Sequence, residues 1–159
     1  MQDSSLESRI ARATLGQLIA GVRSRVVQVC QARVAEHKLT AQQFWALVVL
    51  HEKGSLCLRE LSEELWCDEP TASRMMKALV RDGWVQARPD PSHGRRLAIR
   101  VAPTAELKVR DLHREALELR KGLKAGLSAG EEAILRSLLA RLLCNLDVLE
   151  AAASEPGKP

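Results

Sequence analysis

Basic side chains at helical spacing are the first feature of this chain that can do chemistry. Arg74, Lys77 and Arg81 recur at intervals of three and four residues, which on an α-helix places them within an arc of roughly 60°. An apolar group falls on the opposite side of the same helix: Ala72, Met75, Met76, Leu79 and Val80. A short helix with a buried back and a cationic front suits the major groove of DNA. There, side chains from its N-terminal end, Thr71, Ser73 and Arg74, can reach base edges or phosphates.

A second basic cluster follows in a turn-rich segment, residues 89–96 (PDPSHGRR). Arg95 and Arg96 lie in it, Arg88 and Arg100 flank it, and Asp90 is its single acid. Arginines at a hairpin tip are suited to a narrow minor groove, where the negative potential is concentrated. We therefore predict a DNA-binding surface formed by Thr71, Ser73, Arg74, Lys77, Arg81, Arg95 and Arg96.

The elements that must position these residues can be predicted from periodicity and end signals. Capping boxes at Thr40 with Gln43 and at Ser128 with Glu131 start two helices. Gly54 ends the first of these, and Gly83 ends the helix over 68–82. The pattern predicts helices over 6–37, 40–53, 58–65, 68–82, 103–124 and 128–152, with strands over 84–88 and 97–102.

Two helices joined by a tight turn and followed by a hairpin form a winged helix-turn-helix. The predicted fold is mainly α with a small β-hairpin wing, in a single domain over 1–159. Residues 40–103 would form the winged helix-turn-helix lobe. A helical dimerisation region would be formed by residues 6–37 together with residues 104–152. The last helix carries a seam of leucines at alternating steps of four and three, which is typical of a coiled coil and predicts a homodimer: Leu135, Leu139, Leu142, Leu146 and Leu149.

Three segments resemble the core of the MarR family of bacterial transcription regulators: 58–65 (LRELSEEL), 71–74 (TASR) and 79–85 (LVRDGWV). Residues 90–95 (DPSHGR) are similar to the wing tip of that family. The resemblance implies an obligate dimer, built from the first, fifth and sixth predicted helices, on a palindromic operator. It also implies that a small ligand, often an aromatic acid, releases the DNA of a repressor.

The chain departs from the family pattern at three positions. His93 stands where the family usually has an Asp that braces the wing arginine, so Arg95 is expected to be held differently. Trp66 replaces a usual Gly in the turn, and Cys57 replaces the usual Thr cap of the helix over 58–65. Cysteine caps a helix poorly.

An effector site is predicted around His51, which shares a helical face with apolar residues. Trp45 would supply a flat wall there, and Arg25 or Arg33 a counter-charge for a small aromatic carboxylate. The alternative is a histidine satisfied within the core.

Other classes of function find less support in the sequence. No metalloprotease, hydrolase, Walker A or dinucleotide motif is present, so we expect no enzyme activity and no cofactor. Cys30 and His37 offer too few ligands for a zinc site. A thiol-based redox regulator of the same fold, with Cys67 the cysteine to watch, stays an alternative. A helical interaction module without DNA binding is another alternative.

The sequence contains no signal peptide and no membrane-spanning run, and its cysteines are unpaired, so we expect a cytoplasmic protein. The net charge of +4 permits a polyanionic partner without requiring one.

Overall fold

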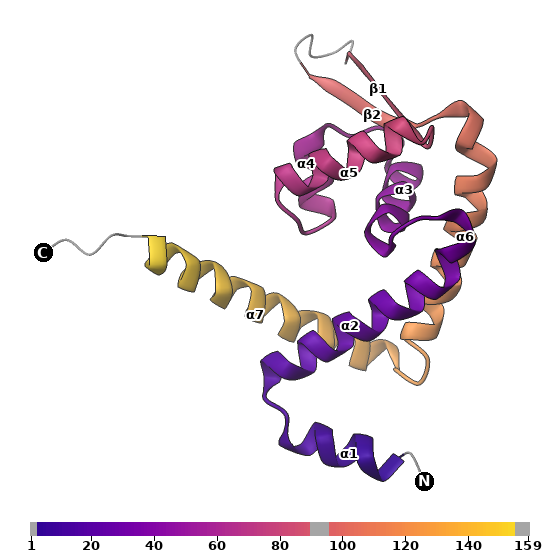
Figure 1. Ribbon diagram of the computed structural model, residues 1–159. Helices are drawn as coiled ribbons and strands as arrows, with labels where there is room; N and C mark the ends of the chain where they lie inside the picture. The colour runs from indigo at the N-terminus through magenta and orange to yellow at the C-terminus, as the bar shows by residue number, and fades with distance from the viewer. Residues whose placement is uncertain (1–2, 90–95, 155–159) are drawn as a thin grey trace, which may run out of the picture. The chain divides into compact units, whose positions relative to one another are not determined.

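Most of the chain is helical, with one β-hairpin, in a computed structural model that describes residues 3–89 and 96–154 (Figure 1). The predicted class, mainly α with a hairpin wing, is confirmed. The elements are α1 (Asp3–Arg12), α2 (Leu15–Val34), η1 (Ala35–His37), α3 (Ala41–Lys53), α4 (Leu58–Glu64), α5 (Glu69–Arg81), β1 (Val85–Pro89), β2 (Leu97–Val101), η2 (Pro103–Ala105), α6 (Glu106–Leu123) and α7 (Ala129–Ser154). The chain divides into two compact units, Met1–Leu119 and Arg120–Pro159, and each is described by itself.

The predicted helix over 6–37 is wrong as one element, because it is interrupted at Ala13 and Thr14. Thr14 has extended backbone and caps α2: its hydroxyl accepts from the Gln17 backbone N–H at 3.3 Å, and Gln17 Oε1 accepts from the Thr14 N–H at 2.8 Å. This reciprocal box satisfies two backbone donors that a new helix start would leave unpaired.

The core of the first unit forms where α2, α3 and α6 meet the helix-turn-helix and the hairpin. Phe44, Leu47 and Leu50 of α3 are fully buried, and so are Leu61 of α4 and Leu79 of α5. The predicted box at Thr40 and Gln43 starts α3. Gly54, at φ +82°, ends it in a conformation that favours glycine.

The helix-turn-helix consists of α4 and α5, joined by the tight turn that was predicted at Trp66 and Cys67. Trp66 adopts a left-handed backbone, φ +53°, a conformation that favours glycine, and its side chain is exposed. The buried face of α5 holds Ala72, Met76 and Leu79. The prediction that Val80 belongs to this face is wrong: its side chain is 44% exposed, because it lies at the edge of the buried stripe.

The wing is the antiparallel pair of β1 and β2, each within one residue of the predicted bounds. Val85 pairs with Val101 and Arg88 with Ala98. Val85, Ile99 and Val101 are buried against the core. Leu56, in the connection between α3 and α4, exchanges two backbone hydrogen bonds with Ile99, of 2.8 and 3.0 Å. The connection thus adds a short third row to the hairpin.

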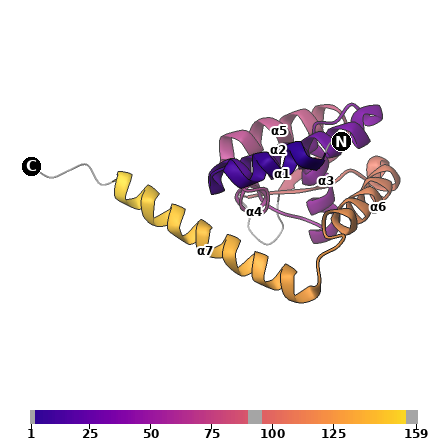
Figure 2. The ribbon, with the colours of Figure 1, turned by 90° about the horizontal axis from the view of Figure 1, so that it is seen from below.

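The second unit is dominated by α7, a single uninterrupted helix (Figure 2). Its start is the predicted box, in which Ser128 Oγ accepts from the Glu131 N–H and Glu131 Oε2 accepts from the Ser128 N–H. Most of the predicted leucine seam is exposed in the isolated chain: Leu135 47%, Leu139 41%, Leu146 58% and Leu149 65%. None of the described helices is long and apolar enough to cross a membrane.

Candidate nucleic-acid interface

The first turn of α5 carries a short network of polar side chains. Asp68 caps the helix by accepting from the Thr71 backbone N–H at 2.7 Å. Hydrogen bonds from the hydroxyl and backbone of Thr71 hold the pKa of Asp68 below its usual range, so its carboxylate is charged. Thr71 Oγ1 in turn accepts from Arg74 Nη2 at 3.0 Å. Arg74 is therefore held toward the N-terminal end of α5, the end that enters a groove in helix-turn-helix proteins.

The other basic residues of α5 differ in how they are partnered. Lys77 is exposed on the same face as Arg74. Arg81 forms two hydrogen bonds with Asp82, of 2.8 and 3.2 Å. This contact raises the pKa of Arg81 and lowers the pKa of Asp82, each through the hydrogen bond first. The pair reduces the positive charge that Arg81 offers to a phosphate.

The wing adds exposed arginines beside the helix-turn-helix. Arg88 lies near the end of β1, Arg100 lies in β2, and Arg96 directly precedes β2. Figure 1 shows the hairpin beside α4 and α5. Arg95 and the predicted wing tip, 90–95, lie outside the described residues. Among described residues, the predicted contacts thus come from one helix, α5, and the base of the wing.

Comparison with known proteins identifies this arrangement. Residues 39–97, which span α3 to the start of β2, match the sequence profile of the MarR family. The multiple antibiotic resistance protein MarR of Salmonella typhimurium is 28% identical over 130 residues, 81% of this chain and 90% of that protein. The chain is thus similar to the MarR family of transcription regulators.

Solved structures of MarR-family proteins have the same fold. A mutant MarR from Escherichia coli, complexed with operator DNA, superimposes with a TM-score of 0.69 at 27% identity, over 81% of this chain and 93% of that one. BpsR of Bordetella bronchiseptica, whose DNA binding is regulated by 6-hydroxynicotinic acid, superimposes with a TM-score of 0.68 at 22% identity, over 81% and 92%. At that identity the second likeness shows the fold alone.

Away from the DNA-binding elements, His51 lies in a cluster that joins α3 to α6. Its ring centroid is 5.0 Å from that of His113, and its Nδ1 is 3.6 Å from Glu106 Oε1. His113 Nε2 is 3.0 Å from Glu52 Oε1. Both acidic neighbours disfavour a carboxylate beside His51. Glu52 follows His51 in the sequence, whereas Glu106 was absent from the sequence-based expectation because α6 lies far along the chain.

The other predicted effector residues have partners of their own or stand apart. Trp45 packs edge-on to Phe44, with ring centroids 4.9 Å apart. Arg33 pairs with Glu115 of α6 at 3.0 Å. Arg25 is exposed on α2. Among the described residues, no hydrogen bond, ion pair or ring contact joins Arg25 or Arg33 to His51, so a common site for these residues stays a prediction.

The cysteines considered for a thiol switch lie in surroundings that disfavour the thiolate. Burial raises the pKa of the Cys30 thiol, although a hydrogen bond with Trp45 and the charge of Arg33 oppose this. Burial and the adjacent Asp68 carboxylate raise the pKa of Cys67. Because the thiolate is the reactive form, both shifts weaken the redox alternative. The described part of the chain contains no group of three or more His, Cys, Asp or Glu that could hold a metal ion.

Proposed function

We propose that this protein is a homodimeric repressor that binds a palindromic operator through α5 and the wing. The observation that carries the proposal is the exposed face of α5, where Arg74 points to the N-terminal end and Lys77 lies beside it. A MarR protein that is 27% identical to this chain forms a complex with operator DNA. The proposed contacts are Thr71, Ser73, Arg74, Lys77, Arg81, Arg95 and Arg96.

Dimer formation is supported by apolar surface in each unit. In the first unit, Leu15 and Val22 of α2 are 56% and 60% exposed, and Leu6 of α1 is 54% exposed. In the second unit, four of the five seam leucines of α7 are exposed: Leu135, Leu139, Leu146 and Leu149. Large contiguous apolar surface is uncommon on monomers and marks interaction sites. A two-fold dimer would present two copies of α5 to successive major grooves about one helical turn apart.

Release by a small aromatic acid completes the proposed function. BpsR, which has the same fold, is regulated in its DNA binding by 6-hydroxynicotinic acid. A ligand needs only to favour a dimer whose recognition helices mismatch the half-site spacing, and a coupling of about 1–3 kcal/mol changes affinity about 5–150-fold. His51, Trp45, Arg25 and Arg33 remain one proposed location, which the variant His51→Ala tests by its response to 6-hydroxynicotinate.

The proposed function can be tested by fluorescence anisotropy with a labelled random duplex over a range of salt concentrations. Contacts to several phosphates should make the logarithm of the affinity fall linearly with that of the salt concentration. Lys77→Gln should flatten this slope by about one unit if Lys77 meets one phosphate. Arg114→Gln, an exposed arginine on α6 paired with Asp111, serves as the matched control. Salt-insensitive or absent binding would favour the helical interaction module.

A further inference from the structure

Trp66 is unusual because both its backbone and its side chain are unfavourably placed. It lies in the turn between α4 and α5 with φ +53°, a left-handed conformation that residues other than glycine, asparagine and aspartate rarely adopt. Its side chain is 78% exposed, the largest fraction among the exposed large apolar side chains that the structure describes. The tryptophan therefore strains the turn without contributing a buried side chain to the core.

The turn itself is held by backbone hydrogen bonds. The Trp66 N–H donates to the Glu63 carbonyl oxygen at 3.2 Å, and the Cys67 N–H donates to the Ser62 carbonyl oxygen at 3.1 Å. Neither bond involves the indole, so glycine or asparagine could form the same turn with less strain. Strained residues that the surrounding fold does not require are concentrated at functional sites.

The position of Trp66 relates it to the DNA-binding elements. It lies two residues before Asp68, the N-cap of α5, and two residues of chain span at most about 7 Å. From Asp68, hydrogen bonds lead through Thr71 to Arg74. In a helix-turn-helix the first helix crosses the DNA backbone, and the N-terminal end of the second enters the major groove. The turn that joins the two helices would therefore lie at the edge of the groove, beside the sugar–phosphate backbone.

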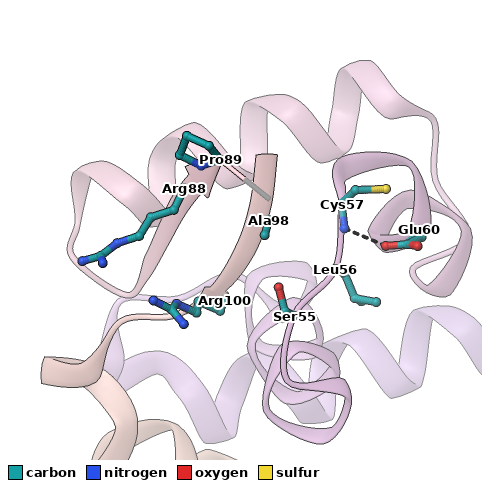
Figure 3. Close-up of a pocket in the computed structure, with 8 residues that line it drawn as sticks. All are labelled: Ser55, Leu56, Cys57, Glu60, Arg88, Pro89, Ala98 and Arg100. Atoms are coloured by element: carbon teal, nitrogen blue, oxygen red, sulfur yellow. Dashed lines mark hydrogen bonds between the residues drawn. The ribbon is translucent and has the colours of Figure 1, made fainter. Parts of the chain in front are cut away.

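Most of the acidic residues that precede the turn have partners within the protein. Three glutamates of α4 are held in this way: Glu60 by the Cys57 backbone N–H at 2.7 Å, Glu63 by Arg59 at 3.0 Å and Glu64 by Lys53 at 3.0 Å. Figure 3 shows Glu60 bonded to Cys57 at the start of α4. These partners offset negative charge that would repel phosphate. Glu69 is exposed after the turn, so the contact open to Trp66 is apolar rather than ionic.

An indole is suited to the sugar–phosphate backbone because it combines a flat apolar face with one polar group. The face can pack against the C–H groups of deoxyribose, and the ring N–H can donate to a phosphate oxygen. Such a contact is uncharged, so it displaces no counterion and should leave the salt dependence of binding unchanged. This property distinguishes it from a contact made by lysine or arginine.

We propose that Trp66 is a DNA contact, with its indole packed against the sugar–phosphate backbone at the N-terminal end of α5. The inference rests on the proposed function and adds to it a residue outside the basic clusters of α5 and the wing. It explains why the turn holds a tryptophan that is both strained and exposed, since the indole becomes covered only when DNA is bound.

The test compares stability with DNA affinity in Trp66→Asn and Trp66→Phe. Asparagine adopts the left-handed conformation more readily and has no ring, whereas phenylalanine keeps a ring and loses the N–H. Lys38, at φ +55°, is the other described non-glycine residue with positive φ, and it is exposed. Lys38→Asn is therefore the matched control for strain. Circular dichroism gives the melting temperature, and fluorescence anisotropy with a labelled duplex gives the affinity at several salt concentrations.

We expect Trp66→Asn and Lys38→Asn to melt no lower than the wild type, because each relieves a left-handed residue. Trp66→Asn should bind DNA about tenfold more weakly, the change expected when burial of roughly half of a large apolar side chain is lost. Its salt slope should equal that of the wild type. Trp66→Phe should keep part of the affinity, and Lys38→Asn should bind like the wild type.

A second measurement reports the contact itself. Acrylamide quenches the fluorescence of exposed tryptophans, and Trp66 is exposed whereas Trp45 and Trp84 are half-buried. Addition of DNA should protect part of the wild-type emission from acrylamide. The same addition should leave the quenching of Trp66→Phe unchanged, because the indole that DNA covers is absent.

Three results would overturn the proposal. Wild-type affinity in Trp66→Asn would leave the indole to a partner other than DNA, and the proposed function would stand if Lys77→Gln still flattened the salt slope. Weaker binding together with a lower melting temperature, and no protection from acrylamide, would assign Trp66 to the stability of the turn. A wild-type protein without salt-dependent DNA binding would overturn both this proposal and the proposed function.

Discussion

Arg74 Nη2 donates a hydrogen bond to Thr71 Oγ1 at 3.0 Å, one helical turn back along α5. Asp68 completes the set, since it accepts from Thr71 and is itself held charged by that contact. The guanidinium is thereby oriented before DNA arrives. An oriented side chain loses less conformational entropy on binding than a free one. We therefore expect the contact with Thr71 to strengthen base recognition by Arg74.

Replacing Arg74 with Ala should relax sequence preference. A bidentate contact from arginine to guanine is worth about 1–3 kcal/mol of discrimination, so the ratio of affinities for selected and random duplexes should fall by that free energy. Arg81→Ala is the matched control and should cost less, because Asp82 already occupies its guanidinium. Equal losses in the two variants would contradict the assigned roles.

Thr71 should act as a positioning residue for Arg74. Thr71→Val keeps the shape of the side chain and removes the hydroxyl acceptor, whereas Thr71→Ser keeps the hydroxyl. We expect Thr71→Val to lose part of the discrimination lost in Arg74→Ala, with a similar salt slope, and Thr71→Ser to restore it. A Thr71→Val protein that discriminates like the wild type would remove Thr71 from the readout.

The capping carboxylate of Asp68 should make the stability of the protein depend on pH. Its pKa is lower in the folded state, so its contribution is present above the usual Asp range and is lost as the pH falls through the folded value. Asp68→Asn keeps a good cap but does not titrate. The melting temperature of the wild type should exceed that of Asp68→Asn near neutral pH and converge with it on acidification. A constant difference between the two would contradict the assignment.

The leucine seam of α7 should be required for assembly. A charge at a seam position would be buried without a partner in a dimer, at high cost. We expect Leu139→Glu to lower the apparent mass in light scattering to that of one chain and to weaken operator binding. Ser137→Glu, on the same helix away from the seam, should leave both unchanged. A dimeric Leu139→Glu protein would place the interface elsewhere.

The sequence was informative where the signal is local. Capping residues and terminal glycines placed α3, α5 and α7, and the alternation of Leu97, Ile99 and Val101 placed β2. The break before α2 was missed although its signal is present: Thr14 and Gln17 have the spacing of a capping box, but the apolar period continues across them. Val80 was assigned to the buried face because a helical wheel does not show where the stripe ends.

The candidate sites depended on contacts that no local pattern encodes. The acidic neighbour of His51, Glu106, arrives from α6, more than fifty residues along the chain. The third row of the wing depends on Leu56 meeting Ile99 across two intervening helices. The Thr71–Arg74 contact could have been predicted from the sequence, because residues three apart on one helix are neighbours. Whether Arg74 turns toward Thr71 depends on its side-chain rotamer.

The proposed function is tested most directly by sequencing the duplexes that the purified protein selects from a random pool. Selection is repeated at a fixed salt concentration for the wild type and, in parallel, for Arg74→Ala. The selected sequences report the symmetry of the operator and the contribution of Arg74 to base recognition. A two-fold symmetric sequence is predicted, with half-sites about one helical turn apart, roughly 10–10.5 base pairs, and weakened preference in each half-site for Arg74→Ala. Enrichment of an asymmetric sequence, or of none, by the wild-type protein would contradict operator recognition by a dimer.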